Sequence, residues 1–125
     1  MIDITASVAA WVHSVKARDG LLTVFLRHIS ASLTIQESAD EHLRAGVLKI
    51  LGSLAPDHSA HGRMHAAADD GVLDPIKALL TSVSLSIPVF EDTMALSPWQ
   101  GIFLIEHRRR LAPRTIALCF VGSHH

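Results

Sequence analysis

The chain has 125 residues, 49% of them hydrophobic and 18% charged, so it is long enough and apolar enough to bury one core, which argues against disorder. Eleven Lys and Arg against twelve Asp and Glu give a net charge of −1, which disfavours general nucleic-acid binding because that needs a basic surface. No run approaches the roughly 20 apolar residues of a membrane span, and no signal pattern opens the chain, so we expect a cytoplasmic protein with neither nucleic-acid nor membrane partners.

The first forty residues predict one helix followed by two strands. Apolar side chains recur at helical spacing near the N-terminus: Val8, Trp11, Val12 and Val15. A turn at 19–20 leads to a buried strand over 21–27, and a second strand follows over 31–36. The polar step at 28–30 is expected to bend the chain between the two strands.

The middle of the chain predicts a helix and then a long polar loop. An apolar period of 3.6 residues runs from about residue 40 to residue 54, with Ser38 or Asp40 as its cap, and Pro56 ends it. Apolar periodicity disappears over 57–71, where side chains that can bind metals gather: His58, His61, His65, Asp69 and Asp70. A polar loop of this length in a compact domain is typical of a functional or a mobile segment.

The last third predicts a short helix over 74–80, which Pro75 suits as a first-turn residue, and then strands at 85–89, 94–96, 101–107 and 115–121. The Arg-rich segment between the last two strands predicts a hairpin. About six strands against two or three helices, without strict alternation, favour an α+β fold with mostly antiparallel pairing in one domain at 1–122. The tail at 123–125 is typical of a tag junction and is left out of the chemistry.

Two residues in these apolar stretches are expected in the core. The single cysteine, Cys119, excludes an internal disulfide, agrees with a reducing compartment, and is interpreted as a buried structural thiol. Trp99 more often packs in a core in so apolar a context, but it could instead stack on a planar ring of a ligand, with Gln100 donating a hydrogen bond beside it.

His28 is the first candidate for chemistry because it follows a buried strand and imidazole suits proton transfer near neutral pH. Glu37 and Asp40 come within reach of His28 if the two strands pair as a hairpin, and a carboxylate beside an imidazole fixes its tautomer and raises its basicity. In the alternative interpretation Asp40 is a helix cap, and the two roles are compatible.

A divalent metal such as zinc is a second possibility, since the chain has nine histidines. His65 and Asp70 offer nitrogen and oxygen ligands that His28 could complete. The alternative is that His58 and His61 are solvated loop residues. His107 follows a strand and is either an edge residue or a side chain that turns toward the site.

One dense basic cluster contains Arg108, Arg109, Arg110 and Arg114. It could hold a phosphate through bidentate N–H donors. The alternative is a solvated loop that protects the edge of a sheet. No Walker loop, dinucleotide-binding glycine pattern, HExxH motif or nucleophile elbow is present in the sequence, so those enzyme classes are set aside.

Several ordered blocks together resemble the YjbQ-like family from about residue 3 to residue 122. They are 20–25, 28–33, 35–37, 39–40, 85–89, 99–103 and 106–108. The resemblance implies a sandwich-like, mostly antiparallel α+β fold, a homotrimer, and a His-lined site with a divalent metal near subunit boundaries. It also implies a secondary thiamine-phosphate synthase activity, which joins a hydroxymethylpyrimidine diphosphate to a thiazole phosphate and leaves the primary cellular role open.

The resemblance also assigns roles to individual residues. It implies catalytic roles for His28, Glu37 and Asp40, and a metal site of His28, His65 and Asp70. It implies binding of a small phosphorylated substrate by the following residues: Ser30, Trp99, Gln100, Arg110 and Arg114.

The chain departs from the family pattern at several positions near the site. The replacements are Ile29, Ser38, His42, Gly46, Asp92 and Thr93, where the family usually has Thr, Asn, Asp, Asp, Gly and Arg. No histidine occurs between 66 and 106, so Asp74, His61 or another chain would have to replace the family's third histidine. The sequence thus supports two hypotheses equally, an enzyme and a divergent trimer with a degraded site that only binds or supports structure, and a metal buffer as a third.

Overall fold

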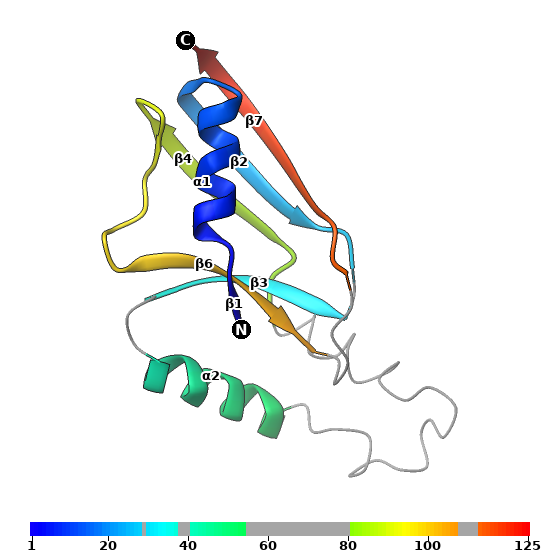
Figure 1. The fold of residues 1–125 in the computed structure, drawn as a ribbon. Helices are drawn as coiled ribbons and strands as arrows, with labels where there is room; N and C mark the ends of the chain where they lie inside the picture. Colours follow the sequence, from blue (N-terminus) through cyan, green and yellow to red (C-terminus); the bar gives the residue numbers. More distant parts are fainter. Residues whose placement is uncertain (29, 38–40, 55–80, 108–112) are drawn as a thin grey trace.

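A computed structural model of the protein describes residues 1–28, 30–37, 41–54, 81–107 and 113–125 (Figure 1). Along these residues the elements are β1 Ile2–Asp3, α1 Thr5–Ser14, β2 Ala17–Leu26, β3 Ala31–Glu37, α2 Glu41–Leu54, β4 Ser84–Phe90, β5 Thr93–Met94, β6 Gln100–Glu106 and β7 Ile116–His124. The predicted α+β class is confirmed. The helix expected at 74–80 and the His-rich segment 57–71 lie outside the described residues.

The strands of the described residues form two antiparallel sheets, one in the order β5-β4-β2-β7 and the other in the order β1-β6-β3. Alternation along β2 decides which face is buried: Leu22 and Val24 are fully buried, whereas Leu21 and Phe25 on the opposite face are exposed. Helix α1 lies in front of β2 and β4 (Figure 1), where Val8 joins the core cluster. The core therefore lies between α1, the inner face of the four-stranded sheet and the three-stranded sheet.

The three-stranded sheet is buried on both faces, which explains the uninterrupted apolar run of β6. Ile102 and Leu104 belong to the main core, whereas Phe103 points away from it and is fully buried as well. Arg44 of α2 lies over the Phe103 ring, 5.0 Å from its centroid, a geometry that a guanidinium and an aromatic face favour. Helix α2 lies along this sheet on the side away from α1 (Figure 1).

A hydrogen-bonded link attaches the start of α1 to the middle of β6. The Asp3 carboxylate accepts hydrogen bonds from the Thr5 hydroxyl at 2.6 Å and the Thr5 backbone N–H at 2.9 Å. The Thr5 hydroxyl oxygen in turn accepts from the backbone N–H of Ile102 at 2.8 Å. The two bonds from Thr5 lower the pKa of the Asp3 carboxyl below its ordinary value, because they favour its charged form.

The predicted hairpin between the last two long strands is wrong. β6 pairs with β1 and β3, whereas β7 pairs with β2 in the other sheet. The prediction assumed that strands next to each other in sequence pair with each other. Here β6 and β7 instead lie in different sheets, and each packs against the same core. The strands β2 and β3 do not pair either, so the hairpin expected to bring Glu37 toward His28 is not formed.

Two residues expected in the core are exposed. Along β7 the side chains of Leu118 and Phe120 pack against the core, so Cys119 between them points outward and is an exposed free thiol. The apolar run masked the period-two alternation of a strand that is buried on one face. Trp99, in the turn before β6, is 64% exposed.

The start of β2 and the end of β7 approach each other closely at a pair of glycines. Gly20 and Gly122 face each other in the ladder, and a Cβ on either would collide with backbone atoms of the other strand. Neither glycine has a positive φ, so close approach is what requires glycine here. The tail left out of the chemistry continues this ladder, with His124 opposite Ala17.

Candidate functional site

A pocket of about 510 Å³ opens where β2 ends and β3 begins. Its lining residues are Phe25, Leu26, Arg27, His28, Ser30, Val83 and Arg114. Three of the candidates from the sequence, His28, Ser30 and Arg114, therefore share one pocket. Arg27, which the sequence did not single out, adds a cation with no acidic partner among the described residues.

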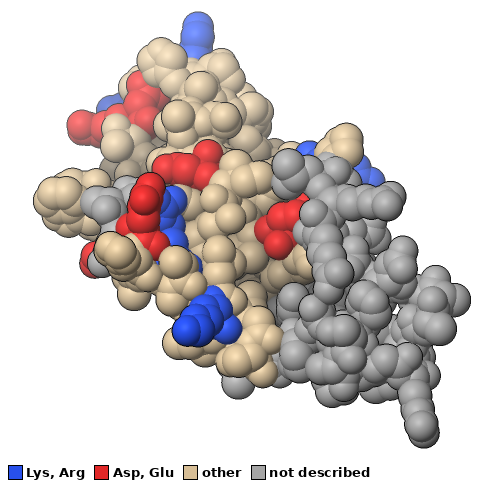
Figure 2. Space-filling model, turned by 60° about the horizontal axis from the view of Figure 1, so that its bottom comes forward, with Lys and Arg blue, Asp and Glu red and all other residues tan. Residues whose placement is uncertain are grey.

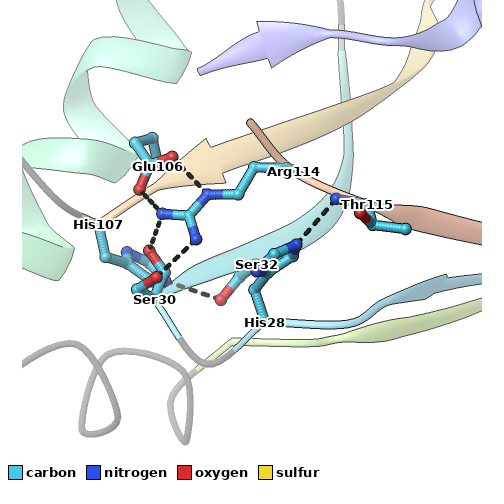
Figure 3. Close-up of polar contacts among 7 residues, drawn as sticks. All are labelled: His28, Ser30, Ser32, Glu106, His107, Arg114 and Thr115. Atoms are coloured by element: carbon cyan, nitrogen blue, oxygen red, sulfur yellow. Dashed lines mark hydrogen bonds and ion pairs between the residues drawn. The ribbon is translucent and has the colours of Figure 1, made fainter. Parts of the chain in front are cut away.

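His28 is held by the backbone that leads into β7. The Thr115 backbone N–H donates to Nε2 of His28 at 2.8 Å (Figure 3). The carbonyl of Thr115 accepts from the backbone N–H of Arg27 at 3.2 Å, so the β2–β7 pairing places the donor that His28 meets. The partner that the described residues give His28 is thus a main-chain amide and not Glu37, whereas Asp40, the other predicted carboxylate, lies outside the described residues.

Arg114 forms a buried ion pair with Glu106, whose side chain is 9% exposed against 6% for the arginine. Its Nε donates to one carboxylate oxygen at 2.7 Å and Nη2 donates to the other. The remaining bonds go to Ser30, from Nη1 to Oγ at 2.6 Å and from Nη2 to the carbonyl at 3.3 Å (Figure 3). Most of the guanidinium donors are thus used inside the protein, where they fix the start of β3 against the end of β6.

His107 turns into the protein, which settles the choice between an edge residue and an inward one. It is buried, and its Nε2 lies 2.7 Å from the Ser32 hydroxyl, which also contacts the Thr81 hydroxyl. Its backbone N–H donates to the Ser30 carbonyl at 3.0 Å. His107 therefore supports the wall behind the pocket.

The remaining described candidates lie at the other end of β3. In the β3–β6 ladder Ala31 is opposite Glu106 and Glu37 is opposite Gln100. The two ends of the ladder are separated by the length of the seven-residue strand β3, roughly 20 Å. Gln100 accepts from the Ser97 backbone N–H at 2.9 Å through its side-chain oxygen. Glu37 and the Trp99–Gln100 pair are therefore not brought to His28 within one copy of the chain.

Four predicted site residues, Asp40, His65, Asp70 and Arg110, lie outside the described residues. The metal site assigned to His28, His65 and Asp70 therefore stays a prediction. Within the part of the chain that the structure describes, no three His, Cys, Asp or Glu side chains gather as a metal site would require.

Glu106 and Thr115 were assigned no role from the sequence. Glu106 ends β6 and Arg114 lies before β7, so the fold brings the two side chains together and no repeat within one helix or strand could reveal the contact. Thr115 acts through its backbone, for which side-chain identity gives no signal. One signal in the sequence could have identified Glu106: it is a single carboxylate at the end of the continuous apolar run of β6.

The fold and this pocket define a small two-sheet α+β protein with a histidine and an arginine at one strand end. The family model "UPF0047 protein YjbQ-like" matches residues 1–123. Similar curated proteins include the UPF0047 protein YjbQ of Salmonella typhimurium, 39% identical over 83% of this chain and 75% of that protein. The UPF0047 protein sll1880 of Synechocystis sp. is 34% identical over 94% of this chain and 80% of that protein.

A solved structure agrees with these relatives. It is an uncharacterized conserved protein of the yjbq/upf0047 family from Clostridium acetobutylicum, with a TM-score of 0.82 and 28% identity over 96% of this chain and 89% of that chain. The chain belongs to the YjbQ/UPF0047 family, which confirms the resemblance drawn from the sequence blocks. Across the described ranges, no helix is long and apolar enough to cross a membrane.

Proposed function

We propose that the pocket beside His28 binds a small phosphorylated ligand, and that the chain carries the thiamine-phosphate synthase-like activity that the family resemblance implies. The observation that supports this is the placing of Arg27 and His28, side by side in sequence, on one pocket without a carboxylate in its described lining. A guanidinium with no acidic partner is suited to a phosphate because its planar N–H donors match two oxygens at once.

In such a reaction the C–O bond to the diphosphate breaks, and the diphosphate leaves with the bonding electron pair. The thiazole nitrogen forms the new C–N bond to the methylene carbon of the pyrimidine. Negative charge grows on the departing oxygen, and N–H donors placed beforehand stabilise it. We assign this role to Arg27 with His28 beside it, because Arg114 spends its donors on Glu106 and Ser30.

The test is a thiamine-phosphate assay on the untagged chain with hydroxymethylpyrimidine diphosphate and thiazole phosphate. Arg27→Ala and His28→Ala should each lower kcat/KM at least tenfold, since a hydrogen bond to a charged group contributes about 1.5–3 kcal/mol. Arg18→Ala is the matched control, because Arg18 is an exposed arginine that lies beside Asp19 at the opposite end of β2 from Arg27. A wild-type chain without activity, or variants as active as the control, would contradict the proposal.

A second candidate is the divergent family member that binds or supports structure without catalysis. The observation that favours it is that Arg114 bonds to Glu106 and His107 contacts Ser32, while Arg114 and the His107 backbone N–H both donate to the Ser30 carbonyl. A polar cluster of this kind can serve stability alone. Under this hypothesis the wild type binds pyrophosphate but gives no product, and His28→Ala changes binding alone. Calorimetry beside the same assay separates the two candidates.

We propose further that the chain forms a homotrimer and that its site is shared between copies. Support comes from the length of β3, roughly 20 Å, which separates its Ala31 end beside the His28 pocket from its Glu37 end. The outer face of the four-stranded sheet is a second support, because Leu21, Phe25 and Val121 are 45%, 44% and 71% exposed there. By contrast, Figure 2 shows a face on which Lys and Arg of the described residues are interspersed with Asp and Glu.

A mixing experiment tests the shared site. His28→Ala and Glu37→Ala chains, each inactive alone, are unfolded and refolded together, and light scattering gives the mass of the product. A shared site predicts a trimer with partial activity, because some interfaces then combine an intact His28 with an intact Glu37 from another copy. A monomer, or a mixture as inactive as its parts, would overturn this proposal.

A further inference from the structure

The hydrogen bond to His28 decides where the proton of its ring lies. Nε2 is 2.8 Å from the Thr115 backbone nitrogen, and a backbone N–H can only donate. Nε2 must therefore accept with its lone pair. A neutral imidazole carries one N–H, so the proton of His28 sits on Nδ1.

We infer that His28 is fixed as the Nδ1-protonated tautomer and meets its ligand as a hydrogen-bond donor to an oxyanion, and does not act as a metal ligand. Among the described residues Nδ1 has no hydrogen-bond partner, so it is the nitrogen left for a ligand in the pocket that His28 lines. The inference rests on the proposed function in one respect, that the ligand carries acceptor oxygens.

Metal binding fails at both nitrogens for the same reason. A metal on Nε2 would have to displace the Thr115 N–H, since a nitrogen has one in-plane lone pair. A metal on Nδ1 would require the ring proton to move to Nε2, where it would point at the Thr115 N–H. Metal-binding histidines donate their second N–H to an acceptor, and His28 meets a donor there instead.

The donor is set by main-chain pairing, so it does not depend on a mobile side chain. Leu26 is opposite Ile116 in the β2–β7 ladder, and the Arg27 N–H donates to the Thr115 carbonyl at 3.2 Å. His28, the residue after Arg27, then lies beside the backbone N–H of the same Thr115. The tautomer is thus built into the register of the four-stranded sheet.

The other polar groups of the pocket fit the same class of ligand. Arg27 brings N–H donors, and the Ser30 hydroxyl oxygen accepts from Arg114, which leaves its own O–H to donate. Glu106 does not line the pocket, because its carboxylate is taken up by Arg114. Donors without an opposing carboxylate select an oxyanion and disfavour a cation.

Nuclear magnetic resonance on the ¹⁵N-labelled full chain at neutral pH measures the tautomer directly. Long-range proton–nitrogen correlations of His28 should show a protonated Nδ1 and an unprotonated Nε2. Thr115→Pro, which removes the N–H, should abolish this preference, whereas the matched control Thr115→Ala should keep it. An Nε2-protonated ring in the wild type would overturn the inference, and that measurement needs no variant.

Inorganic pyrophosphate and zinc chloride are the two ligand probes. Pyrophosphate should shift the His28 Nδ1–H signal, and His28→Ala should weaken its binding roughly tenfold. His28→Asn should bind within about threefold of wild type, because its amide N–H replaces the Nδ1–H. Zinc coordinated stoichiometrically by His28, or His28→Asn as weak as His28→Ala, would overturn the donor role. Loss of synthase activity alone would count against the proposed function and leave these outcomes unchanged.

Discussion

The two ends of the β3–β6 ladder differ in how far the fold orders their side chains. At the Ala31 end, Glu106, Arg114 and Ser30 are joined in a buried network. At the Glu37 end, Trp99 and Gln100 are exposed. One end is therefore preorganised by the fold of a single copy, whereas the other presents side chains that a ligand or another copy could order. The difference separates residues that build a site from residues that could only complete one.

Of the substitutions that test this difference, breaking the Arg114–Glu106 ion pair should lower the free energy of unfolding most. Arg114→Met leaves the carboxylate of Glu106 buried without its cation and should lower the free energy of unfolding by about 3–5 kcal/mol in urea titrations. Trp99→Ala, at the exposed end, should change it by less than about 0.5 kcal/mol.

The double variant Glu106→Gln/Arg114→Met sharpens the result, because it removes both charges and should recover much of the loss. If Arg114→Met lowered the free energy of unfolding no more than Trp99→Ala, the buried network at the Ala31 end would not contribute to stability as proposed.

Removing the Ser32 hydroxyl should have the next largest effect. Ser32→Ala takes away the group that His107 and Thr81 both contact and should cost about 1–3 kcal/mol in the same titration. Thr34→Ala is the matched control two residues further along β3, where the hydroxyl accepts from Gln36 at 3.2 Å on a half-buried surface. Equal losses in the two variants would mean that the His107 contact contributes nothing special.

The smallest effect concerns Asp3, which lies opposite Phe103 near the middle of the ladder. Its folded pKa is lowered by bonds from Thr5, so its contribution is fully present above the unfolded pKa, about 3.9, and is lost as pH falls through the folded pKa. Asp3→Asn should therefore cost only about 0.5 kcal/mol at pH 6, because the site is exposed, and progressively less as the pH falls through the folded pKa. Thermal unfolding across that range measures it, and a loss independent of pH would show that the charge is not involved.

The sequence predicted the elements that are defined by a local apolar pattern, but it did not predict how the strands pair. The apolar run at 21–27 and the helical period at 40–54 correspond to β2 and α2 because each element is defined by its own periodicity. The partner of β7 was predicted wrongly, since pairing with β2 is decided by the shared core. Thr115 acts through an amide that every residue but proline has, so no reading of side chains could have found it.

The pairing of β2 with β7 also governs when the protein can fold. The Asp19 backbone N–H donates to the Ser123 hydroxyl across a separation of 104 residues. Closing so long a loop is entropically costly and makes sheet formation slow. On the ribosome, β2 must wait for β7, which begins at Ile116, to emerge before it gains this neighbour. The nascent chain therefore keeps an open strand edge at β2 until β7 is available, and the His28 site is assembled only after that.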